Sequence, residues 1–209
     1  MATEKKNGYE GIYLWVVEKL AGFDLTGNAP HLGLKANDDG SVQVNFLNRE
    51  YQVNSDGAKP LDGRPVGITH LSVVAHYAMS SGRGEPSLEF VSLDKKSGTV
   101  SGSQGSFQRE SVSNPLVRKF GADQPALEAA VARIGGRPEG RSESGGWSWL
   151  FFPFPKMPLK LIYHEADEEF EAEFRLLYDN RCTDFMEFEA VAFVGGILVD
   201  ELLSMKTTY

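Results

Sequence analysis

Residues 158–177 read PLKLIYHEADEEFEAEFRLL, and this stretch decides the fold. Apolar side chains alternate with polar ones on both sides of the acidic segment 165–168. A period of two is typical of half-buried strands, so the pattern predicts strands at 159–164 and 169–176 joined by a four-residue turn. The sequence therefore predicts an antiparallel hairpin and, with it, a fold built on antiparallel sheet.

The same alternation predicts a register. A turn at 165–168 places Tyr163 opposite Phe170 on one face and His164 opposite Glu169 on the other. Apolar side chains then share the first face and ionisable ones the second, as a half-buried pair requires. Because a slip of one residue would bury the glutamates, we expect Tyr163 beside Phe170 on the buried face.

Other segments supply the rest of an α+β fold. Residues 42–46 and 51–53 alternate as a second hairpin, with its turn near 47–49. Four segments carry apolar residues at helical spacing: 9–21, 65–80, 124–134 and 187–204. The second of these is apolar around much of its circumference, which predicts a central helix. In the last, Gly195-Gly196 indicates close packing of another element, because glycine disfavours a helix interior.

We therefore predict one α+β domain over residues 1–209, with antiparallel hairpins packed by four or more helices. A chain of 209 residues is long enough for one well-buried core and short for two. The segment RPEGRSESGG at 137–146 is the best candidate for an internal boundary.

Charge is concentrated in one part of the chain. Ten of the 29 acidic residues and two of the 21 basic ones lie in 165–189, which leaves 19 of each elsewhere. This distribution disfavours nucleic acid and anionic membranes, since both attract Lys and Arg. It favours a cation, a basic protein or solubility alone. No apolar run could span a membrane, and one cysteine, Cys182, cannot form an internal disulfide, so we expect a cytoplasmic protein.

The acidic hairpin also supplies the candidate metal ligands. Carboxylates and an imidazole at Glu169, Glu171, Asp179 and His164 are the side-chain types that bind divalent cations. The alternative interpretations are a solvated strand face and a docking surface for a basic partner.

Candidate cofactor-binding residues are aromatic. Trp147 and Trp149 alternate in the segment WSWLFF and could form a stacking platform, although packing in the core is the alternative. His76 flanks the apolar stripe of 65–80, where we expect a largely buried ring with a hydrogen-bond partner. The segment GTVSGSQG at 98–105 lacks the P-loop lysine and reads as a turn-rich connector. No nucleophile motif or zinc motif occurs, so catalytic residues and any cofactor stay unknown.

Several short motifs resemble an uncharacterised bacterial and archaeal family, domain of unknown function 3786. They are FLNREYQV (46–53), HY (76–77), LVRKFG (116–121), PLKL (158–161), DEEF (167–170) and LYD (177–179). The resemblance covers nearly the whole chain and implies a prokaryotic, largely anaerobic origin. Some relatives carry an iron–sulfur domain like those of corrinoid methyl-transfer systems, which implies a link to one-carbon or corrinoid metabolism. This chain has no cluster cysteines, and its residues 182–186 depart from the expected His-Tyr pattern.

These observations favour an accessory protein that binds a small molecule, a cofactor or a partner protein. A metal-dependent enzyme that uses the acidic hairpin and Asp179 is the second hypothesis. A purely structural interaction module is the third. Whether the protein is an enzyme, and in what oligomeric state it works, stay open at this point.

Overall fold

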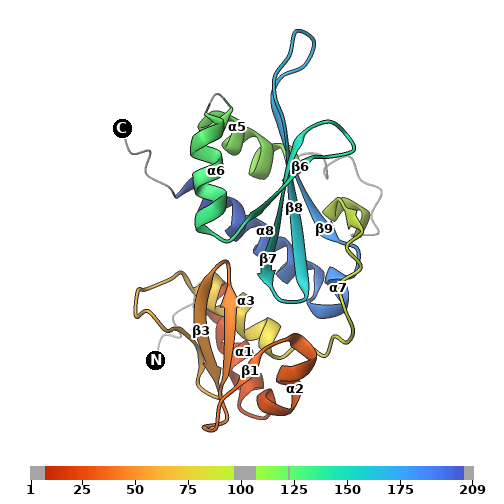
Figure 1. The fold of residues 1–209 in the computed structure, drawn as a ribbon. Coiled ribbons are helices and arrows are strands. Elements are labelled where there is room, and N and C mark those ends of the chain that lie inside the picture. The colour runs from red at the N-terminus through yellow and green to blue at the C-terminus, as the bar shows by residue number, and fades with distance from the viewer. Residues whose placement is uncertain (1–7, 97–106, 122, 205–209) are drawn as a thin grey trace.

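Two antiparallel sheets organise the chain (Figure 1). The computed structural model describes residues 8–96, 107–121 and 123–204. A four-stranded sheet in the order β1-β2-β3-β4 lies in the N-terminal lobe, residues 8–79, and a five-stranded sheet in the order β5-β9-β8-β7-β6 lies in the C-terminal lobe, residues 90–203. Helices pack on both sheets, so the predicted α+β class is confirmed.

The N-terminal lobe contains the second predicted hairpin. Its elements are α1 (Gly8–Leu20), α2 (Leu25–Leu32), β1 (Lys35–Ala36), β2 (Val42–Phe46), β3 (Arg49–Asn54), β4 (Gly57–Pro60) and α3 (Ile68–Ala78). Leu47 and Asn48 form the two-residue turn between β2 and β3, with φ of 50° and 62°. Positive φ at both positions gives the turn a twist that matches the flanking strands.

The C-terminal lobe holds the other elements. They are β5 (Phe90–Val91), the 3₁₀-helix η1 (Leu93–Lys96), the π-helix η2 (Phe107–Ser113), α5 (Asn114–Phe120), α6 (Gln124–Arg133), β6 (Arg137–Arg141), β7 (Trp147–Phe154), β8 (Met157–His164), β9 (Glu173–Asp179), α7 (Cys182–Phe185) and α8 (Phe188–Leu203). Residues 137–146, the candidate boundary, form β6 and its turn into β7. The segment 98–105 lies outside the described residues.

The acidic hairpin forms, but its predicted register is wrong. Tyr163 lies opposite Phe174, not Phe170, so β9 is displaced by four residues. An even displacement leaves the same face of β9 buried, and the Tyr163 and Phe174 rings stack with centroids 4.5 Å apart. The displacement brings Leu176 and Tyr178 into the core, whereas the predicted register would have placed the smaller Ala172 there.

Contacts from outside the hairpin hold this register. The backbone N–H of Phe174 donates to Ser113 Oγ at 3.0 Å, and Gln108 Nε2 donates to the Phe174 carbonyl at 3.0 Å. Residues 165–172 therefore form a long loop that protrudes from the C-terminal lobe (Figure 1). Asp167 Oδ1 accepts from the backbone N–H groups of Glu169 and Phe170, both at 2.8 Å, and Phe170 is 69% exposed.

The two lobes share an aromatic core. Phe154, at the end of β7, stacks on Phe46 at 4.7 Å and on Tyr77 at 4.2 Å, both from the N-terminal lobe. The Tyr77 hydroxyl donates to the Leu32 carbonyl at 2.9 Å and accepts from the Lys156 N–H at 3.1 Å. Burial raises the pKa of Tyr77, so the hydroxyl stays protonated and keeps both bonds.

The helices confirm two further expectations. Five of the apolar residues of α3 are buried, which confirms its central position: Val73, Val74, Ala75, Tyr77 and Ala78. In α8, a Cβ on Gly195 would meet the Tyr178 ring at 2.8 Å, so the expected close packing is present there. A Cβ on Gly196 would meet nothing within 4 Å.

Candidate functional site

Asp179, one of the four candidate metal ligands, is enclosed at the end of β9. Its carboxylate accepts hydrogen bonds from the backbone N–H groups of Ser87 at 3.1 Å, Leu88 at 2.6 Å and Arg181 at 2.8 Å. The Ser87 hydroxyl donates a fourth at 3.0 Å. Asp179 is 0% exposed, so both of its oxygens serve to anchor the segment before β5.

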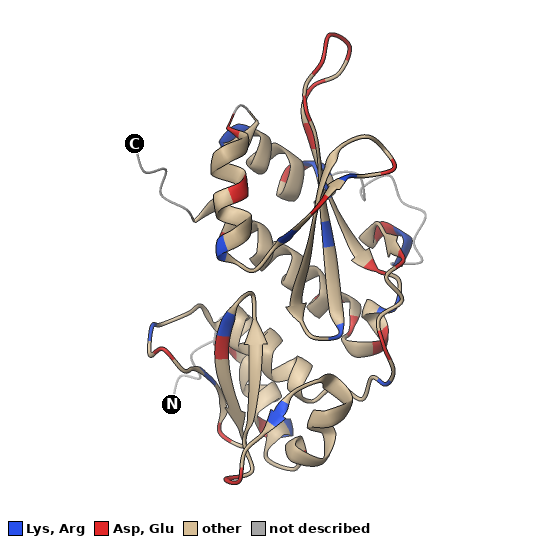
Figure 2. Ribbon diagram, in the orientation of Figure 1, with Lys and Arg blue, Asp and Glu red and all other residues tan. Residues whose placement is uncertain are grey.

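The other three candidates lie apart from it. Glu169 and Glu171 are in the exposed loop, where Figure 2 shows acidic residues in red along its length. His164 ends β8, and its Nε2 lies 3.3 Å from Ser144 Oγ. Within the described part of the chain, no three His, Cys, Asp or Glu side chains converge as a metal site would require.

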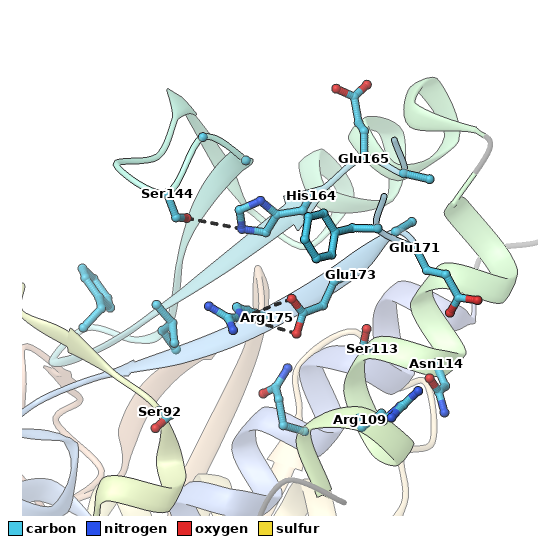
Figure 3. A pocket seen from close by; sticks show the side chains of 18 of the residues that line it. Ser92, Arg109, Ser113, Asn114, Ser144, His164, Glu165, Glu171, Glu173 and Arg175 are labelled. Carbon is cyan, nitrogen blue, oxygen red and sulfur yellow. Dashed lines mark hydrogen bonds and ion pairs between the residues drawn. The ribbon is translucent and has the colours of Figure 1, made fainter. Parts of the chain in front are cut away.

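A wide cleft of about 1270 Å³ lies at the base of this loop (Figure 3). Figure 3 shows the His164 ring directed at Ser144, and the Glu173 and Arg175 side chains paired beside it. Glu173 and Arg175 are 3.3 Å apart, and Arg141 lies 3.6 Å from Glu165. Four of the charged side chains that line the cleft are therefore paired with each other, and all four are partly exposed.

The candidate aromatic residues do not form one platform. Trp149 is buried in the core, and Trp147 is half-buried with the Arg141 guanidinium 4.5 Å from its ring. No described group accepts a hydrogen bond from the buried Trp147 indole N–H. His76 lies in the other lobe on α3, where its aromatic neighbour is Trp15, with ring centroids 6.0 Å apart.

His76 instead lines a groove that the sequence reasoning missed. A hollow of about 500 Å³ lies between α1, α3 and α8, and its polar lining is sparse. Three large α1 side chains line it: Tyr9, Ile12 and Trp15, which are 56%, 45% and 44% exposed. Val73 of α3 and Phe193 of α8 complete the apolar lining. An exposed apolar cluster rimmed by polar groups is typical of a binding surface.

A second hollow of about 540 Å³ continues the first. Both are lined by Trp15, His76 and Glu187, and the second extends to Phe23 and the α7–α8 junction. We call the two hollows together the α1 groove. Its floor is α3, one wall is α1, and the other wall is α7 with the first turns of α8.

The polar group at the centre of the α1 groove is the half-buried His76 imidazole. Its Nδ1 lies 3.2 Å from the Ser72 carbonyl oxygen, which can only accept, so Nδ1 carries the proton. Burial lowers the pKa of His76, which keeps the ring neutral at pH 7. In that state Nε2 is a hydrogen-bond acceptor. The expected hydrogen bond of His76 is present, although the ring is less buried than expected.

The sequence did contain one signal of this groove. The stripe that predicts α1 runs through Tyr9, Ile12, Val16 and Leu20, and only Val16 and Leu20 are buried. Trp15 lies off that stripe, where a large apolar side chain on a surface helix has no core to enter. An apolar residue beside a complete stripe indicates a second apolar surface.

The chain matches a known protein family. The model of the family described as "Domain of unknown function (DUF3786)" matches residues 24–201, which includes elements of both lobes and begins after α1. No curated protein and no solved structure matches the chain. None of the described helices is both long and apolar enough to cross a membrane.

Proposed function

The chain belongs to the family of the domain of unknown function DUF3786, and we propose that it is an accessory binding protein whose α1 groove takes up a largely apolar ligand. The observation that carries this proposal is the groove itself, with exposed Tyr9, Ile12 and Trp15 around one neutral imidazole. A cytoplasmic location is part of the proposal, supported by the buried free thiol of Cys182.

Energetics support binding at this surface. Full burial of a large apolar side chain contributes roughly 1.5–3 kcal/mol. The groove presents three such side chains that are each about half exposed, so a ligand that covers them would gain roughly half of this from each. Ligand sites are mostly concave and apolar, with a few polar groups that fix orientation, and typical volumes are roughly 300–1,000 Å³. The hollow of about 500 Å³ with His76 Nε2 as acceptor fits this description.

A neutral fluorescent probe, N-phenyl-1-naphthylamine, tests the proposal. We expect saturable enhancement of its fluorescence by the wild-type protein and loss of that enhancement in Ile12→Asp. Leu14→Asp is the matched control, because Leu14 is 41% exposed on another side of α1 and does not line the groove. Equal enhancement by both variants would contradict the assignment of the groove.

The natural ligand can be sought in protein from its own host. Native mass spectrometry of that protein should show a retained mass that Ile12→Asp lacks. The resemblance implies a corrinoid or one-carbon compound, and this stays a prediction. Reconstitution with a corrinoid would produce saturable visible absorbance if it is correct.

A further inference from the structure

We propose that the occupant of the α1 groove is an amphipathic helix of a partner protein that carries Lys or Arg beside its apolar face. This inference rests on the proposed function, because it names the chemistry of what the same groove binds. Three observations carry it: the length of the groove, the arrangement of its walls and the sign of its rim.

The groove is longer than one small ligand requires. Its α1 wall runs from Tyr9 to Lys19, which is about 15 Å at 1.5 Å per helical residue. Trp15 and His76 stand where the two hollows meet, so the hollows form successive compartments. A helix projects side chains on one face at three- and four-residue spacing. Its apolar residues would fill the first compartment, and residues at the edge of its apolar stripe would enter the second, where Lys19, Ser80 and Asp184 add polar groups to the lining.

The walls are themselves helices that leave a place for another. Both α1 and α8 pack on α3, and the Tyr9 and Phe193 rings meet edge-to-face at 5.9 Å to close one end. Beyond this closed end, α1 and α8 border the first hollow on opposite sides, and α3 forms its floor. Ala190 lines the hollow on the α8 side. A partner helix laid along this space would pack beside α1 and α8 and bury the exposed faces of Tyr9, Ile12 and Trp15.

The rim of the groove is acidic. Asp184, Glu187 and Glu189 line the α7–α8 wall. Asp184 is paired with Arg181 at 2.8 Å, whereas neither Glu187 nor Glu189 forms an ion pair within the described part of the chain. On the opposite wall, Lys19 lies over the Trp15 ring at 3.6 Å. Two carboxylates opposite the apolar α1 wall complement a partner with basic residues flanking an apolar stripe.

Synthetic peptides test this inference on the full-length chain. A fluorescein-labelled Leu/Lys peptide of about four helical turns, with its leucines on one face, is titrated by fluorescence anisotropy. We expect saturable binding. A scrambled peptide of the same composition should bind about tenfold more weakly or worse, and a Leu/Glu peptide with the same stripe should not bind.

Variants locate the contact. Glu187→Gln with Glu189→Gln should weaken binding of the Leu/Lys peptide by roughly fivefold and reduce its dependence on salt. The matched control is Glu10→Gln with Glu143→Gln, which removes the same charge from exposed positions outside the groove lining and should leave binding unchanged. Ile12→Asp should abolish binding while Leu14→Asp retains it. Circular dichroism checks that each variant is folded.

The outcomes separate the two proposals. Binding of all three peptides alike, or binding that the glutamate pair does not affect, overturns the helix as occupant. Binding of N-phenyl-1-naphthylamine without binding of the Leu/Lys peptide also overturns it, and leaves the groove as a small-molecule site. If neither probe binds, the proposed function itself fails.

Discussion

The hydroxyl oxygen of Tyr178 lies where a side chain on Gly195 would begin: a Cβ there would be only 1.9 Å away. Tyr178 belongs to β9 and Gly195 to α8, so a missing side chain lets the helix pack directly on the sheet. A Cβ on the neighbouring Gly196 would meet nothing within 4 Å. Two adjacent glycines in one helix therefore have different structural roles.

Substitution of each glycine by alanine should have opposite effects. Gly195→Ala should lower the free energy of unfolding by about 1–3 kcal/mol or more, because the new methyl group displaces the Tyr178 ring. Gly196→Ala should raise it by about 0.5–1 kcal/mol, because alanine favours the helix and fills open space. Urea unfolding monitored by circular dichroism measures both. Equal effects would contradict the packing described for Gly195.

Asp179→Asn should destabilise the protein by about 3 kcal/mol. The asparagine amide nitrogen cannot accept the N–H groups that now reach both carboxylate oxygens, so buried donors lose their partners. Urea unfolding gives the change in free energy. Asp38→Asn, at an exposed position, is the control for loss of one negative charge. If Asp179→Asn lowers the free energy of unfolding no more than the control does, Asp179 does not anchor the segment before β5.

Divalent cations should have no specific effect on stability. Asp179 is saturated by hydrogen bonds, and Glu169 and Glu171 lie in an exposed loop away from it. Thermal unfolding with millimolar Mg²⁺, Mn²⁺ or Ca²⁺ should therefore show the same midpoint as NaCl of equal ionic strength. A rise specific to one cation would favour the metal-dependent enzyme instead.

Cys182 should resist thiol reagents in the folded protein. Burial raises the pKa of its thiol from 9.0 to about 11, so the thiolate at pH 8 is about a hundredfold scarcer than in the unfolded chain. Ellman's reagent should therefore react at least that much more slowly in buffer than in guanidinium chloride. Since the chain has one cysteine, the signal has one source. Comparable rates in both solvents would mean that the thiol is accessible.

The His76 imidazole should titrate below the ordinary histidine range. Its folded pKa is lowered by burial, so the unfolded chain binds this proton more tightly than the folded one does. Stability from the neutral ring is present above the ordinary pKa and is lost as the pH falls through the folded pKa. The NMR titration of the ring C–H proton, assigned by its absence in His76→Gln, measures the pKa. A value above the ordinary 6.5 would contradict the burial of the ring.

The hairpin shows what a period of two can and cannot specify. Alternation identified Tyr163 and Phe174 as residues of the buried face, and both are there. It could not choose between registers that differ by an even number, because every such register buries the same face. Two contacts from outside the hairpin favour the observed register: Ser113 and Gln108 bind the Phe174 backbone from more than sixty residues away.

The α1 groove was missed for a related reason. Helical spacing identified α1 correctly, but a stripe says only which residues share a face. Whether Tyr9 and Ile12 are covered depends on α3 and α8, which lie far along the chain and leave that end of the face open. The candidate metal ligands share a side-chain type, and side-chain type gives no information about which carboxylate the fold saturates with hydrogen bonds.

The stack of Phe46, Phe154 and Tyr77 has a consequence for how the chain can be divided. Each ring has its partner in the other lobe, so either half alone would present bare aromatic faces to water. Halves cut between α3 and β5 should therefore aggregate when made separately and regain solubility when produced together. The aromatic stack therefore predicts that the two sheets fold together.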